Sequence, residues 1–175
     1  IGGYGEMHYG NSEGKGQMDF HRYVLFINHE YNDILSFASE FELEHAIAGE
    51  GKPGEVELEQ AYIEHKWSQF GLDNTSAKYG VFLIPCGITN EIHEPNTFYG
   101  VERNTVEKEI CSNTRWEGGV QIKHVMPDQD LTILAGIHSP LNTSNGDIRG
   151  GRQKVGEATM NVPAYTAAIR YTGVY

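Results

Sequence analysis

The sequence predicts an all-β protein, an antiparallel up-and-down β-barrel with about eight strands. Three observations predict it: side chains alternate between apolar and polar with period two, helical periodicity is weak, and short connections alternate with long ones. The 175 residues are read as a single barrel domain or a fragment of one. Strands of a membrane barrel need only about 9–11 alternating residues, so a mean hydropathy of −0.46 agrees with this fold.

Eight segments carry the alternation, and in chain order they span 1–9, 19–31, 35–45, 55–67, 77–84, 116–123, 130–138 and 165–174. The third segment is the clearest, because its apolar and acidic residues separate onto two faces. Leu35, Phe37, Phe41 and Leu43 share one face, interrupted by Ser39. Glu40, Glu42 and Glu44 share the other, and we expect them to face a concave interior while the apolar residues face outward.

The connections between these segments predict the topology. Three are short, at 32–33, 68–76 and 124–129, and four are longer or rich in glycine, at 10–17, 46–54, 85–115 and 139–163. Strict alternation places all short connections at one end of a meander. Outer-membrane barrels have this arrangement, with short periplasmic turns and longer outer loops, whereas a Greek-key sandwich has no reason to produce it.

Aromatic residues and cysteines leave alternatives open. Five aromatic residues lie near the ends of predicted strands: Tyr9, Tyr23, Tyr31, Trp67 and Tyr171. They are either part of the aromatic girdles of a membrane barrel or present because aromatic residues favour strands. Cys86 and Cys111 match no zinc or redox motif, and are either a disulfide pair or two unrelated thiols.

Charge excludes some partners. The formal charge of −11, from 24 acidic and 13 basic residues, argues against nucleic acid as a partner, because nucleic acid requires a basic surface.

The polar faces of the strands supply the candidate pore-lining residues: Arg22, Glu30, Glu40, Glu42, Glu44, Tyr62, Glu64 and Arg170. Acidic groups outnumber basic ones there, which predicts a weak preference for cations.

The connection 85–115 is the predicted functional loop, because it is too long for an ordinary hairpin turn. Its charges suit a loop folded into a water-filled lumen, where it would narrow the pore; the alternative is a solvated surface excursion. The constriction candidates are Glu102, Arg103, Glu107, Lys108 and Arg115. A cluster of basic residues at the narrowest point would reverse the expected cation preference.

Enzyme chemistry is not expected. Glycosidases use two carboxyl groups about 5–10 Å apart, and the ladders 40–44 and 55–59 offer such pairs, but every half-solvated acidic strand does. The eight histidines form no HExxH motif or close cluster with cysteine, and the glycines follow no nucleotide-loop pattern. We therefore predict no catalytic residue, cofactor or specific metal site.

Several segments together resemble one family: FHRYVLFINHEYND (20–33), EVELEQAYIE (55–64), GVFLIPCGITNE (80–91), HEPNTFYGVERNTVEK (93–108) and GRQKVGE (151–157). They are similar to bacterial outer-membrane porins of the phosphate-selective group, the relatives of porins O and P. The resemblance implies a sixteen-stranded, trimeric barrel in the outer membrane of a Gram-negative bacterium, of which this chain would be about half.

Those family members rely on basic residues along the pore, and the strand faces here are acidic, so phosphate selectivity is not carried over. The expected function is a passive diffusion channel for small polar or charged solutes, in contact with outer-membrane lipid and lipopolysaccharide. The alternative is a soluble or surface-attached all-β binding domain, such as a carbohydrate-binding sandwich. The direction in which the apolar faces point distinguishes the two.

Overall fold

A computed structural model describes residues 1–87, 89–100, 103–110, 112–144 and 146–173. It confirms the all-β prediction and contains eight strands: β1 (Gly2–Ser12), β2 (Lys15–Asn32), β3 (Leu35–Glu44), β4 (Val56–Lys66), β5 (Thr75–Leu83), β6 (Trp116–Met126), β7 (Leu131–His138) and β8 (Ala164–Tyr171). Each lies within a few residues of a predicted segment. The period-two pattern was therefore sufficient to locate them.

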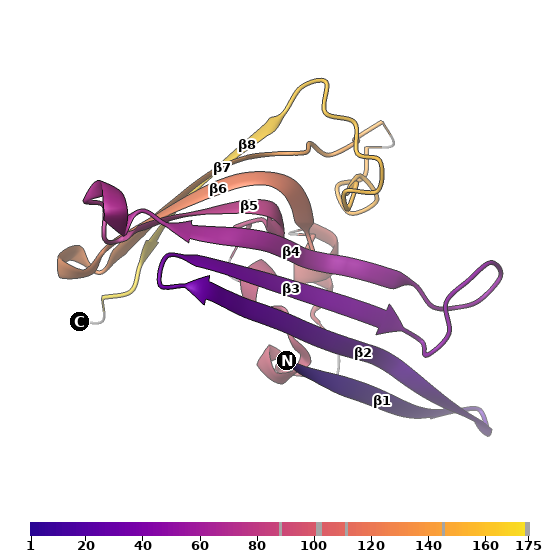
Figure 1. Cartoon of the computed structure of the whole chain (residues 1–175). Helices are drawn as coiled ribbons and strands as arrows, with labels where there is room; N and C mark the ends of the chain where they lie inside the picture. Colours follow the sequence, from indigo (N-terminus) through magenta and orange to yellow (C-terminus); the bar gives the residue numbers. More distant parts are fainter. Residues whose placement is uncertain (88, 101–102, 111, 145, 174–175) are drawn as a thin grey trace.

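The strands form one curved antiparallel sheet in the order β1 to β8, each paired with the next in sequence (Figure 1). β1 and β8 are its two edges, so within the described residues the sheet is open and not closed into a barrel. The meander prediction is confirmed. The turns after β2, β4 and β6 lie at one end, and those after β1, β3, β5 and β7 lie at the other.

One predicted connection was wrong. Residues 10–17 are not a long loop, because β1 and β2 continue past them and pair as far as Ser12 and Lys15. The turn is only Glu13 and Gly14, with φ of 53° and 80°, the left-handed conformation typical of two-residue hairpins. The glycines and polar residues here were mistaken for a loop, although they belong to a hairpin that extends beyond the neighbouring strands.

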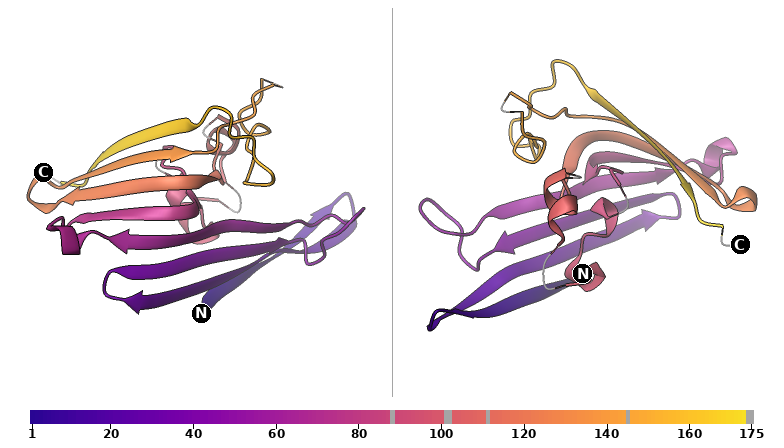
Figure 2. Two further views of the ribbon diagram at one scale, coloured as in Figure 1. Left: turned by 45° about the horizontal axis from the view of Figure 1, so that its top comes forward. Right: turned by 180° about the vertical axis from the view of Figure 1, so that it is seen from behind.

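The remaining regular structure consists of single turns: η1 (Ser68–Phe70), η2 (Asn90–Ile92), η3 (Pro95–Thr97), η4 (Val106–Ile110) and η5 (Pro127–Gln129). In the described part of the chain no helix has both the length and the apolar character needed to cross a membrane. Three of these turns lie in the β5–β6 connection, which packs against one face of the sheet (Figure 2).

The opposite face of the sheet is apolar and uncovered. Phe41 is 37% exposed, although Glu40 and Glu42 on either side of it are only 2% and 4% exposed. On β7 and β8 every residue of this face is apolar: Leu131, Ile133, Ala135, Ile137, Tyr165, Ala167, Ile169 and Tyr171. The expectation that the apolar residues of β3 face away from the interior side is therefore confirmed.

A β-bulge changes the register between β3 and β4. Glu40 pairs with Gln60 but Phe41 pairs with Leu58, so Glu59 has no partner across the ladder. Strict alternation would place Glu59 and Gln60 on opposite faces. Because the bulge inserts an extra residue, both side chains reach the covered face, where each contacts a polar group.

A glycine pair permits close approach between the backbones of neighbouring strands. Gly80 of β5 lies directly opposite Gly119 of β6. A Cβ on Gly119 would lie 2.1 Å from the carbonyl oxygen of Ile137, so the neighbouring strand approaches too closely for any side chain. The pair allows the sheet to curl toward the β5–β6 connection.

Candidate functional site

The β5–β6 connection, residues 84–115, is closed at its base by a buried asparagine. Asn90 is fully buried, and its Nδ2 donates to the carbonyl oxygens of Ile84 at 2.7 Å and Arg115 at 2.8 Å. The backbone N–H of Arg115 donates to Asn90 Oδ1 at 2.9 Å. One side chain therefore fixes both ends of the connection relative to each other.

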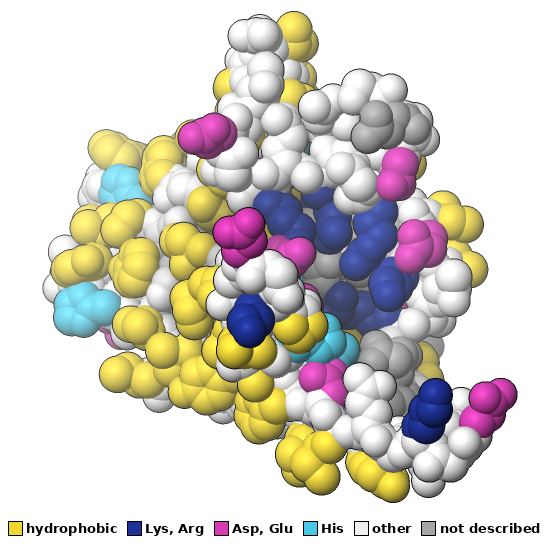
Figure 3. All heavy atoms as spheres, turned by 90° about the vertical axis from the view of Figure 1, so that its right-hand side faces the viewer, with side chains coloured by type: hydrophobic (Ala, Val, Ile, Leu, Met, Phe, Trp, Pro, Cys, Tyr) yellow, Lys and Arg dark blue, Asp and Glu magenta, His cyan; other side chains and the backbone are white. Residues whose placement is uncertain are grey.

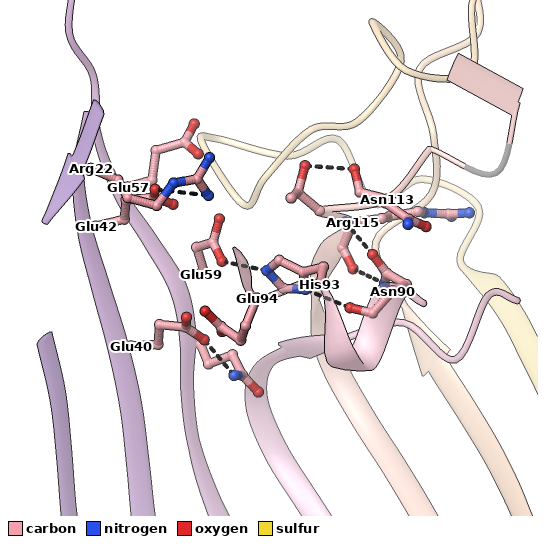
Figure 4. Close-up of polar contacts among 12 residues, drawn as sticks. Arg22, Glu40, Glu42, Glu57, Glu59, Asn90, His93, Glu94, Asn113 and Arg115 are labelled. Carbon is pink, nitrogen blue, oxygen red and sulfur yellow. Dashed lines mark hydrogen bonds and ion pairs between the residues drawn. The ribbon is translucent and has the colours of Figure 1, made fainter. Parts of the chain in front are cut away.

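The connection is held to the sheet by polar contacts. His93 Nε2 lies 3.1 Å from Glu59 Oε2 on β4, and both residues are buried (Figure 4). The Tyr4 hydroxyl on β1 donates to the Glu94 carboxylate, and Arg170 on β8 forms an ion pair with Glu91. The connection thus contacts strands from one edge of the sheet to the other, which favours the predicted inward fold over a surface excursion.

The charge state of His93 follows from these contacts. Burial would lower the pKa of its imidazole, but the hydrogen bond to Glu59 and the charge of that carboxylate raise it above its ordinary value. The contact with Glu59 therefore favours the protonated form of the His93 imidazole over the form expected from burial alone. The connection is therefore anchored by a contact between a buried histidine and a buried carboxylate.

Acidic residues line the sheet beside this anchor. Glu40 Oε2 accepts a hydrogen bond of 2.6 Å from Gln60 Nε2. Arg22 lies between two carboxylates, with Nε 2.8 Å from Glu6 Oε2 and Nη1 3.6 Å from Glu42 Oε1. These residues come from β1, β2, β3 and β4, so the acidic ladder predicted on β3 is part of a wider network.

Basic residues face this ladder from the connections. Arg152 Nη1 donates to the carbonyl oxygen of Thr114 at 2.5 Å, and Lys154 forms an ion pair with Glu57. Burial lowers the pKa of the Arg103 and Arg152 guanidinium groups from their ordinary value, with neighbouring cations acting in the same direction. The β5–β6 and β7–β8 connections therefore supply a positive side to the site.

Between the two sides lies a polar cavity of about 270 Å³. Five basic and five acidic residues line it together with Thr114: Arg22, Arg103, Arg149, Arg152, Lys154, Glu42, Glu44, Glu55, Glu57 and Glu59. Figure 3 looks into the hollow and shows a group of basic side chains with acidic ones around it. Such a charged cavity orients and solvates small ions but offers little apolar surface for a hydrophobic ligand.

The structure brings several sequence candidates together. Arg22, Glu42, Glu44 and Arg103 line the cavity, and Glu40 lies beside it. Other strand candidates lie elsewhere on the polar face: Glu64 accepts from Ser76 Oγ at 2.7 Å, and Lys78 Nζ lies 4.2 Å from the centre of the Tyr62 ring. Glu30 lies by the short turns at the other end of the sheet, in a separate small cavity that Lys66 also lines.

The predicted constriction residues of the β5–β6 connection also lie partly at the cavity and partly away from it. Arg103 lines the cavity and Arg115 stands at the base of the connection, whereas Glu107 and Lys108 lie on its outer turn η4. Glu102 falls outside the described residues. Cys111 does too, so a bond with Cys86 is not described.

Sequence reasoning missed the residues that assemble the site. Asn90, Arg149 and Arg152 were not candidates, Glu59 was predicted only as part of the 55–59 ladder, and His93 only as one of eight histidines without a metal motif. The contacts Asn90–Arg115, His93–Glu59 and Arg152–Asn113 span 25, 34 and 39 residues of the chain, so no local pattern pairs them. The GRQKVGE segment was the only available signal, since it contains Arg152 and Lys154.

No family model matches this chain. The chain is similar to an uncharacterized protein of Aquifex aeolicus (strain VF5), with 36% identity over 183 residues. The match covers 98% of this chain and 40% of that protein. The chain thus spans less than half the length of its relative, and the similarity to phosphate-selective porins stays an interpretation of the sequence.

Proposed function

We propose that this chain forms part of the wall of an outer-membrane β-barrel channel, through which small polar or charged solutes diffuse passively. The observation that carries the proposal is the polarity of the two sheet faces. The apolar face is uncovered, and the polar face is covered by its own connection. A barrel wall needs this distribution, because lipid contacts its outside and water fills its inside.

A soluble sandwich requires the opposite distribution. Its apolar faces pack against each other about 10 Å apart, and its polar faces meet water. Here Ile133, Ile137 and Ile169 are 38%, 39% and 74% exposed on the apolar face. A continuous exposed apolar surface of this kind indicates a lipid or protein partner.

The remaining part of a longer protein would complete the barrel. The matched relative extends well beyond the region that this chain covers, which leaves room for further strands to pair with the edges β1 and β8. In the proposed assembly the apolar face contacts outer-membrane lipid and lipopolysaccharide of a Gram-negative bacterium. The complete protein is expected to form a homotrimer, as the porin resemblance implies.

The proposed mechanism is physical and involves no covalent chemistry. The β5–β6 connection narrows the lumen, and the charges around the polar cavity determine which solutes pass. The strand faces alone suggested an excess of acidic groups, but Arg103, Arg149, Arg152 and Lys154 balance them at the cavity. We therefore expect weak charge selectivity, with the connections contributing as much as the strands.

Reconstitution of the full-length protein tests the proposal. We expect it to be recovered from the outer-membrane fraction and to give stepwise conductance in planar lipid bilayers. A preparation from cells that lack the gene, purified identically, is the control. A full-length protein that stays in aqueous solution without detergent, binds saccharides and gives no conductance would establish the binding-domain alternative.

A further inference from the structure

Three side chains from separate elements converge beneath the β5–β6 connection. Glu40 on β3, Glu59 on β4 and His93 in the connection are 2%, 2% and 4% exposed. Each offers one ligand atom, and the three atoms lie within 4.8 Å of one another. Ligands of a zinc-like ion, with bonds of about 2.0–2.2 Å, lie about 3–4 Å apart. Only a small contraction of the cluster would complete such a site.

The orientation of His93 is that of a metal ligand. Its Nδ1 lies 2.6 Å from the carbonyl oxygen of Asn90, so Nδ1–H donates to the backbone and Nε2 points toward Glu59 (Figure 4). Metal-binding histidines almost always use one ring nitrogen in this way, which fixes the other toward the ion. Because Asn90 is itself held at the base of the connection, the imidazole position is built into the fold.

The carboxylates are also oriented and buried. Gln60 Nε2 donates to Glu40 Oε2 at 2.6 Å, which holds that side chain beside the cluster. Glu94 points into the same region from the connection (Figure 4). A buried carboxyl group is protonated, paired with a cation or bound to a metal, and Gln60, which donates to Glu40, is a neutral amide. A divalent ion would neutralise Glu40 and Glu59 together.

We propose that Glu40, Glu59 and His93 bind a divalent first-row transition metal of the Zn²⁺ or Mn²⁺ type, which pins the β5–β6 connection to the sheet. A ligand set of one imidazole and two carboxylates suits these ions. Ca²⁺ and Mg²⁺ prefer ligands that are all oxygen. The inference does not depend on channel activity, because metal binding is measurable whether or not the protein conducts.

A second cluster provides an internal comparison. Asp19, His21 and His45 also place ligand atoms within 4.8 Å of one another, but all three are half-buried. His21 Nδ1 and His45 Nδ1 already lie 3.1 and 2.9 Å from the Asp19 carboxylate. Variants in this cluster therefore test whether metal binding belongs to the buried site or to any group of histidines.

Co²⁺ titration of the full-length protein in detergent, after treatment with a chelator, tests the proposal. We expect visible absorption bands at one equivalent, displaced by Zn²⁺. His93→Gln and Glu59→Gln should each lower the affinity at least about tenfold, as removal of a ligand or its support does. His45→Gln and Glu64→Gln should leave it unchanged. Amide hydrogen exchange in 89–98 should slow when the ion binds.

A conservative variant keeps the test decisive if His93→Gln fails to fold. His93→Cys retains a ligand at this position, so folded protein should bind Co²⁺ with an added sulfur-to-metal absorption band. Folded His93→Cys that binds Co²⁺ without that band would overturn the proposal. So would an affinity lost in His45→Gln but kept in His93→Gln, or no uptake near one equivalent by the wild-type protein.

Discussion

At the scale of single residues, alternation assigned side chains to faces, but it did not identify their partners. Glu40 and Glu42 were placed correctly because their neighbours on β3 follow period two, with Ser39 as the one polar residue on the apolar face. Glu59 was predicted only as part of the 55–59 ladder, and the bulge that brings it to the same face as Gln60 was not predicted, because a bulge depends on the pairing strand. His93 looked like any loop histidine, since its role depends on a carboxylate 34 residues earlier.

Gly80 offers a test of the bend at this scale. Its φ is +133°, and an added Cβ would lie 2.3 Å from the carbonyl oxygen of Ala61, which is backbone and does not yield easily. We expect Gly80→Ala to destabilise the sheet by about 1–3 kcal/mol, the usual cost of such a backbone conformation in a residue with a side chain. Urea unfolding of the full-length protein in detergent measures the change.

Gly10→Ala is the matched control for this substitution. Gly10 also lies in a strand, but a Cβ there has no atom within 4 Å and its φ is not positive. The urea midpoint of the Gly10→Ala variant should stay within error of the wild-type midpoint. Equal destabilisation by both substitutions would mean that the strands tolerate no alanine at glycine positions, and that the bend is not special.

At the scale of elements, the strands were predictable and the placement of the connections was not. The alternation of apolar and polar residues within a strand predicts which side chains share a face. The 84–115 connection is instead fixed by contacts with β1, β4 and β8, which no local pattern predicts. The 10–17 hairpin shows the converse failure. There the local composition suggested a loop, but pairing between two extended strands overrides it.

Asn90→Ala tests whether one side chain holds the long connection. The substitution removes three hydrogen bonds at the base of the connection and leaves buried carbonyl groups without that donor. Each such loss costs about 1–3 kcal/mol. We expect trypsin to cleave after Arg103 or Lys108 at least about tenfold faster than in the wild type, with the strands still folded.

The control lies in the same connection. Asn96 is exposed and borders a cavity beside Tyr4 and Phe26, so Asn96→Ala should leave the cleavage rate unchanged. An unchanged rate in Asn90→Ala as well would show that the contacts with Glu59 and Arg170 suffice to hold the connection. The asparagine would then have only a local role.

At the scale of the whole molecule, the arrangement of the two faces determines the environment that the sheet can occupy. One face is mainly apolar from β2 to β8 and largely uncovered, and the other carries a charge network and a connection of its own. The sequence predicts the apolar and the polar face, but not the direction in which the sheet curves. That direction follows from the Gly80–Gly119 bend and from contacts between distant residues.

Substitutions on β7 test what the apolar face contacts. Ile133 and Thr132 are neighbours on β7, and their side chains lie on opposite faces of the sheet. A lysine facing lipid near the middle of the bilayer costs about 2–4 kcal/mol, whereas a lysine facing a water-filled lumen is tolerated. We therefore expect Ile133→Lys to reduce the amount of folded protein in the outer membrane severalfold, and Thr132→Lys to leave it near the wild-type amount.

A face packed against another protein sheet would also reject the lysine at position 133, so Ile133→Phe completes the set. A larger apolar side chain is accommodated by lipid, but in a packed protein core it typically costs about 1–3 kcal/mol. Normal assembly of Ile133→Phe together with failure of Ile133→Lys places this face against lipid. Failure of both substitutions would instead place it against a second protein surface, and the membrane-channel proposal would then be wrong.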